Sequence, residues 1–136
     1  MKKVKFAFED LEVWKKAVEF ANTVINLTED MKTERKHYRL IEQLEAASTS
    51  VALNIAEGKG RYSKKEFIQF LYIARGSLYE TITLLVIFLH REWISDAQLN
   101  EIKDLGDRIG KMLSSLINSI KKAHSSSLID HSGDKR

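Results

Sequence analysis

No proline occurs among the 136 residues of this chain. Proline locks φ and removes a backbone donor, so its absence leaves long uninterrupted helices open along the whole sequence. Apolar residues recur at alternating spacings of three and four, which is the period of a helix with one buried face. No segment of the sequence alternates like a strand. The sequence therefore predicts an all-α fold.

The apolar spacing defines four helical segments, two of them in the first half of the chain. The first is predicted to begin near Phe8 or Glu9. After a polar stretch the second carries the same spacing to Ile55, and Gly58 follows as its expected C-terminal cap, since helices commonly end at a glycine.

Two serines predict the starts of the remaining helices. Ser63 and Glu66 have the S-x-x-E spacing of a capping box, and Ser95 stands before the last apolar segment. Four amphipathic helices with short connections are typical of an antiparallel up-down-up-down four-helix bundle. We predict this bundle as one domain over residues 1–123. Residues 124–136 carry no apolar period and are predicted to form a disordered tail.

The third segment has two features that predict close packing. Gly76 lies inside it, and because a helical glycine costs about 1 kcal/mol relative to alanine, we expect it to serve a close approach to the small-residue second helix. The run 82–89 is apolar around almost the whole circumference. One bundle buries a single stripe, so this run predicts a second surface, most simply another subunit.

Catalytic chemistry finds little support in the residues. The chain has no cysteine, which removes thiolate catalysis and Cys-based zinc sites. A di-iron bundle needs two Glu-x-x-His motifs, and only Glu34 to His37 fits. The stretch from Gly58 to Arg61 lacks the spacing of a phosphate loop. We therefore expect no catalytic residue, no metal and no cofactor, and a protein that binds rather than catalyses.

A set of polar residues gathers where the second helix ends and the third begins. One interpretation is a hydrogen-bonded network that holds the turn, and the other is an anion or nucleic-acid contact centred on Arg61. Both stay open for Asn54, Glu57, Arg61, Glu66 and Glu80.

Charge placement is more informative than the formal net charge of +3. In an up-down bundle the N-terminus, the second connection and the end of the fourth helix share one end, which becomes basic. Such an end can attract phosphates without reading sequence; the alternative is a lysine-rich end that favours solubility. The candidate nucleic-acid-binding residues are Lys2, Lys3, Lys5, Lys59, Arg61, Lys64, Lys65, Lys121 and Lys122.

Three stretches carry a family resemblance: FEDLEVWKKA at 8–17, NIAEGKGR at 54–61 and EFIQFLYIARGSLYE at 66–80. Together they resemble the bacterial four-helix-bundle proteins encoded in 23S rRNA intervening sequences, over roughly residues 6–122. The positions that match the family motif, and to which the resemblance assigns structural roles, are Trp14, Asn54, Glu57, Gly58, Gly60, Glu66, Gly76, Ser77 and Glu80.

The resemblance implies a homopentamer with no known enzymatic activity. The related accessory proteins of diversity-generating retroelements are similar bundles, in which a positively charged pentamer supports a reverse transcriptase and nucleic acid, and this implies RNA or DNA binding. The chain departs from the family at Gln43-Leu44-Glu45-Ala46, where relatives usually carry basic residues, so the side of the second helix loses positive charge.

Two functions follow as hypotheses. The first is a cytoplasmic, non-membrane, oligomeric scaffold that binds nucleic acid, RNA or rRNA, through its basic end. The second is a protein-protein adaptor or accessory subunit, for example of a reverse transcriptase, without direct nucleic-acid binding. The charged N-terminal residues lack the apolar run of a secretory signal, which favours the cytoplasm.

Overall fold

The computed structural model describes residues 3–31, 33 and 37–134, with side chains described as far as Ser125. A short 3-10 turn, η1 (Ala7–Asp10), precedes the four helices, which are α1 (Glu12–Asp30), α2 (Tyr38–Lys59), α3 (Lys64–His90) and α4 (Asp96–Asp134).

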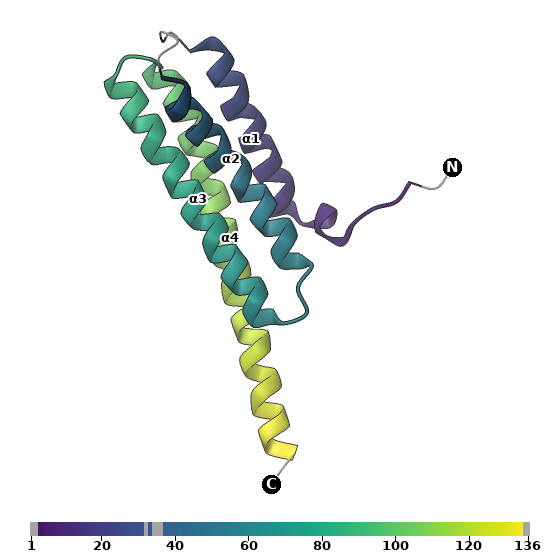
Figure 1. Cartoon of the computed structure of the whole chain (residues 1–136). Helices are drawn as coiled ribbons and strands as arrows, with labels where there is room; N and C mark the ends of the chain where they lie inside the picture. Colours follow the sequence, from purple (N-terminus) through teal and green to yellow (C-terminus); the bar gives the residue numbers. More distant parts are fainter. Residues whose placement is uncertain (1–2, 32, 34–36, 135–136) are drawn as a thin grey trace.

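The four helices form an antiparallel bundle (Figure 1). Contacts join α1 to α2, α2 to α3, α3 to α4 and α4 back to α1, and among the described residues the diagonal pairs α1–α3 and α2–α4 share none. Each helix therefore packs on its two neighbours, and the all-α four-helix bundle predicted from the apolar spacing is confirmed.

The core lies between the four helices. Its largest fully buried side chains include Phe20, Leu44, Phe88 and Ile109, one from each helix. Two polar residues are also buried, and each satisfies its hydroxyl within its own helix: Ser48 Oγ donates to the Glu45 carbonyl (3.0 Å) and Thr81 Oγ1 to the Ser77 carbonyl (2.8 Å). Self-satisfied hydroxyls allow α2 and α3 to approach without leaving a polar group unpaired.

Both predicted serine caps are confirmed. The Ser63 hydroxyl accepts a hydrogen bond from the Glu66 amide (3.0 Å) at the start of α3. Ser95 forms a reciprocal box with Gln98, because the Ser95 hydroxyl accepts from the Gln98 amide (3.1 Å) while the Gln98 side chain accepts from the Ser95 amide (2.8 Å). These bonds satisfy amides that have no partner inside a helix.

The predicted role of Gly58 as a helix cap is wrong. Gly58 is a buried residue inside α2, and the helix ends at Lys59 with Gly60 as its cap. A Cβ placed on Gly58 would lie 2.6 Å from Phe70 Cβ and 3.0 Å from Phe67 Cδ1. The missing side chain therefore allows the first turns of α3 to press against α2, which is a packing role.

The predicted packing role of Gly76 within the bundle is also wrong. Gly76 is exposed on α3, and a Cβ built there would meet nothing within 4 Å. Its neighbour Ser77 faces α2 instead, where its hydroxyl lies 2.9 Å from that of Ser50. The contact between small residues of α2 and α3 thus exists, but it passes through Ser77, one position further along the helix.

The start of the first helix differs from the sequence prediction. The first segment starts as η1, and the extended backbone of Leu11 (φ −74°, ψ 121°) separates it from α1. At the other end α4 continues through Asp134, past the boundary predicted at 123–124. Serine costs a helix only a few tenths of a kcal/mol relative to alanine, so the serine run does not end it. The disorder of residues 124–136 stays a prediction.

Helix α3 is apolar over most of its length. By length and composition alone it could cross a membrane. Of its most apolar 18-residue stretch, 33% is buried within the chain. The core helix of a soluble protein can be equally long and apolar, although it is mostly buried. Within the run 82–89, Leu84, Leu85 and Phe88 are buried, whereas Ile87 remains 45% exposed. The bundle therefore covers only part of this helix.

Candidate nucleic-acid interface

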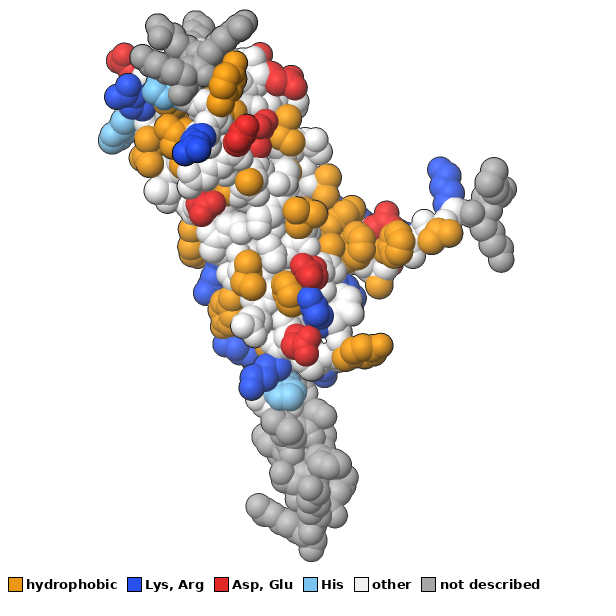
Figure 2. Space-filling view, in the orientation of Figure 1, with side chains coloured by type: hydrophobic (Ala, Val, Ile, Leu, Met, Phe, Trp, Pro, Cys, Tyr) orange, Lys and Arg blue, Asp and Glu red, His pale blue; other side chains and the backbone are white. Residues whose placement is uncertain are grey.

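The turn between α2 and α3 concentrates exposed cations. Lys59, Arg61, Lys64 and Lys65 are all exposed within seven consecutive residues. We call these four side chains the turn cations. Figure 2 shows Lys and Arg side chains gathered at this end of the bundle, where α4 emerges.

Backbone hydrogen bonds hold the turn in one conformation. The Gly60 amide donates to the carbonyls of Ala56 (3.3 Å) and Glu57 (3.2 Å), and the Arg61 amide donates to Gly58 (3.1 Å). The Ser63 cap follows two residues later. With both helix ends satisfied, the turn presents its side chains from a short, ordered connection.

Two of the turn cations pack over aromatic rings of α3. Arg61 Cζ lies 4.7 Å from the centroid of the Phe70 ring, and Lys59 Nζ lies 5.8 Å from that of Phe67. Arg61 Nη2 also pairs with Glu57 Oε1 at 2.9 Å. The same two phenylalanines lie against the Gly58 position, Phe67 through its ring and Phe70 through its Cβ. The packing of α2 on α3 thus fixes the rings, and the cations lie over these rings in cation–π contacts.

The polar set predicted around Arg61 divides into separate parts. Asn54 Nδ2 donates to both the carbonyl and the hydroxyl of Ser50, each at 2.8 Å, and so belongs to the contact between α2 and α3. Glu57 pairs with Arg61. Glu66 contributes its backbone amide to the Ser63 cap, and its side chain is exposed, as is Glu80. The described contacts of this set therefore include both a structural bond and a surface ion pair.

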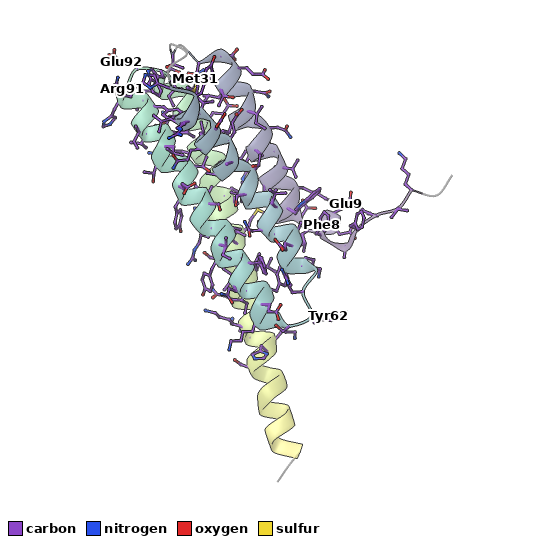
Figure 3. The ribbon with its side chains drawn as sticks, viewed as in Figure 1. Phe8, Glu9, Met31, Tyr62, Arg91 and Glu92 are labelled. Atoms are coloured by element: carbon purple, nitrogen blue, oxygen red, sulfur yellow. The ribbon has the colours of Figure 1, made fainter. Side chains whose placement is uncertain are left out.

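Tyr62 is a feature of the turn that the sequence reasoning missed. Its relative exposure is 107%, so the whole ring is in solvent (Figure 3). Beside it lies a hollow of about 360 Å³ whose wall includes Phe67, Leu116 and Ile120. An aromatic residue directly inside the K-x-R-x-x-K-K run is the signal that could have identified it.

A second group of cations lies on the adjacent face of α3 and α4. Lys121 Nζ donates to the Tyr72 hydroxyl at 2.7 Å, and Arg75 Cζ lies 4.9 Å from the Tyr72 ring centroid. The hydrogen bond from Lys121 lowers the pKa of Tyr72 below its ordinary value. Arg75 also donates to Ser114 (3.3 Å). Tyr72 and Arg75 extend the basic surface from the turn along α3, and Lys122 is exposed beside Lys121.

The predicted cations of the N-terminal arm are not brought to the turn. Figure 1 shows the arm leaving the bundle sideways, away from the connection between α2 and α3. Lys5 pairs with Asp10 at 2.6 Å, and this hydrogen bond raises the pKa of Lys5 and lowers that of Asp10. Lys3 is exposed on the same arm, and Lys2 lies outside the described residues. Trp14 anchors the arm through Phe8, with ring centroids 5.2 Å apart.

A wide groove between α3 and α4 does not extend the basic surface. Its volume is about 900 Å³, and Gly106 and Gly110 line its α4 side. The rim carries both lysines and aspartates, and Lys111 pairs with Asp107 at 3.0 Å. The groove is therefore electrically balanced.

Metal chemistry finds no support in the part of the chain that the structure describes, where no three His, Cys, Asp or Glu side chains come together. Of the one Glu-x-x-His motif, Glu34 lies outside the described residues, and His37 stacks on Trp93 with ring centroids 4.5 Å apart.

A family model identifies the family to which the chain belongs. The profile described as "23S rRNA-intervening sequence protein" matches residues 9–115, well over half of the chain. The chain belongs to this family. The match spans the bundle from η1 to the middle of α4 and includes the α2–α3 turn.

A solved structure supports the same assignment. It is a crystal structure of a protein of unknown function from the S23 ribosomal protein family of Bacteroides thetaiotaomicron. The two chains are 31% identical with a TM-score of 0.72, and the match covers 77% of this chain and 97% of that one. No curated protein matches the sequence significantly. Family membership therefore gives the fold, and no specific role accompanies it.

Proposed function

We propose that this member of the 23S rRNA-intervening sequence protein family is a non-catalytic oligomeric scaffold that binds nucleic acid, RNA in the first place, through the α2–α3 turn. The observation that carries the proposal is the set of four exposed turn cations in and beside one ordered connection. Clustered lysines and arginines bind phosphates and release condensed counterions, and this gives affinity without sequence reading.

The expected test result is a steep dependence of RNA affinity on salt. If each turn cation contacts one phosphate, affinity should fall about 50-fold for single-stranded RNA and about 150-fold for duplex RNA between ~50 and ~200 mM salt. Fluorescence anisotropy with labelled RNA measures this slope. A flat salt dependence, or no binding at ~50 mM salt, would contradict the proposal and favour a protein adaptor.

The oligomer is proposed from the uncovered face of α3. Ile73 and Ile87 of α3 are 46% and 45% exposed, with Gly76 open between them in the sequence, and Leu53 of the adjoining helix α2 is 66% exposed. A monomer gains nothing from such a row, whereas a second copy would bury it. The family resemblance makes a homopentamer the expected assembly, in which each copy adds its own four turn cations.

Placing charge on this face is expected to dissociate the assembly. The double variant Ile73→Glu/Ile87→Glu should reduce the mass measured by light scattering to that of one chain, because each buried carboxylate would lack a partner. Helix content should be unchanged. The matched control is Asn22→Glu, an exposed site on α1, which shares no contact with α3. A wild-type monomer at micromolar concentration would disprove the assembly.

A further inference from the structure

The position of Tyr62 is not explained by the fold. Its ring is entirely in solvent at the tip of the α2–α3 turn, at the end of the bundle opposite Arg91 and Glu92 (Figure 3). The turn cations lie on both sides of it in sequence, with Arg61 directly before it and Lys64 two residues after it. An exposed aromatic ring between cations is the composition of a surface on which nucleobases stack.

The backbone that carries this ring is held without help from a ligand. The bonds from the Gly60 and Arg61 amides fix the backbone before Tyr62, and the Ser63 cap fixes it one residue later. The neighbouring Arg61 is itself held over Phe70. A backbone that is ordered before binding reduces the conformational entropy lost when a partner binds.

The hollow beside Tyr62 gives a stacked base a second surface. Its wall combines apolar side chains of Phe67, Leu116 and Ile120 with Lys59 and Lys64. A base resting on the Tyr62 ring would place its edge over apolar carbon and its phosphates among ammonium groups. In a duplex the bases already stack on each other, so only an unpaired nucleotide can offer its face to the ring.

From this arrangement we infer that the α2–α3 turn recognises unpaired nucleotides, with a base stacked on Tyr62 and the flanking phosphates on the turn cations. The inference rests on the proposed function and adds the class of nucleic acid: single strands, or loops and ends with unpaired bases. Negative charge on the phosphates complements the four turn cations, which favours this ligand over an uncharged peptide.

The test compares Tyr62→Ala with the wild-type full-length protein on two RNA probes at one salt concentration. The probes are an oligouridine of about 16 nucleotides, which covers one typical site, and a blunt duplex of the same length. Loss of one stacked base is expected to weaken oligouridine binding about 5- to 150-fold, with duplex binding changed by less than about 2-fold. Tyr62→Phe and Tyr62→Trp should retain oligouridine binding, because both keep an aromatic face.

The matched control is Tyr38→Ala, which removes another exposed tyrosine at the start of α2, at the opposite end of the bundle. Unchanged oligouridine binding by Tyr62→Ala, or an equal loss on both probes, overturns the inference while leaving the proposed function in place. Binding of neither probe by the wild-type protein overturns the proposed function itself. Tyr62-dependent binding of polyglutamate as tight as that of oligouridine identifies an acidic peptide as the partner and overturns the inference.

Discussion

Substituting Gly58 is expected to destabilise the bundle in proportion to the size of the new side chain. Gly58→Ala should lower the free energy of unfolding by about 1–2 kcal/mol, and Gly58→Val by about 3 kcal/mol or more, as overpacked cores do. The added Cβ would lie 2.6 Å from Phe70 Cβ, an atom attached directly to the α3 backbone. No rotamer change relieves that contact, so α3 itself must move. Urea unfolding followed by circular dichroism measures the loss.

The sign of the Gly58 effect is what makes this prediction informative. Alanine is the better helix former by about 1 kcal/mol, so helix propensity alone predicts stabilisation. Gly110→Ala is the matched control, since its Cβ would lie 3.6 Å from Leu78 Cδ2 in ordinary contact. We expect Gly110→Ala to be neutral or stabilising. If Gly58→Ala also stabilises, the close approach of α2 and α3 at this position is wrong.

Reversing the charge of the turn is expected to remove RNA binding while the fold survives. The variant Lys59→Glu/Arg61→Glu/Lys64→Glu/Lys65→Glu should weaken binding about 100-fold or more at ~50 mM salt, because four attractive contacts become repulsive. The fold should tolerate the change. The Arg61–Glu57 pair is solvent-exposed, and such pairs contribute about 1 kcal/mol or less. Glutamates in the first turn of α3 also interact favourably with its helix dipole.

The control for charge reversal carries the same change elsewhere. Arg39, Arg91, Lys103 and Arg108 are exposed and lie near the start of α2, directly after α3 and in the first half of α4. Reversing these four alters the net charge equally, so a general electrostatic effect would weaken binding by both variants to the same extent. Only the turn variant is expected to lose binding in the anisotropy measurement. Equal losses would show that the turn has no special role.

The four helices and the starts of α3 and α4 were predictable because they depend on local sequence. Apolar spacing defines a buried face whatever the partner, and the Ser63 and Ser95 caps bond to amides only three residues away. The turn cations were predictable for the same reason, since they lie in or directly beside a four-residue connection, where charged side chains reach the surface. The cations of the arm were not, because the helical period ends at Leu11, whose backbone is extended, and the arm before η1 leaves the bundle sideways (Figure 1).

The two misassigned glycines show what a single sequence lacks. Gly58 stands close to a helix end and resembles a cap, whereas Gly76 stands mid-helix and resembles a packing site. Their roles depend on the rotation of α2 and α3 about their axes, which places Phe67 and Phe70 against Gly58 and leaves Gly76 in solvent. Tyr62 was missed because a tyrosine inside a basic run does not by itself show that its ring is fully exposed.

The contact between Gly58 and the two phenylalanines links the stability of the bundle to the positions of two turn cations. Phe70 Cβ and the Phe67 ring lie against the Gly58 position, and the rings of the same two residues lie near Arg61 and Lys59 respectively. A substitution that displaces either ring therefore also displaces a cation, even though it touches no ligand. Substitutions at this turn therefore face two requirements. The phenylalanines must fit against the glycine surface of α2, and their rings must stay beside the cations.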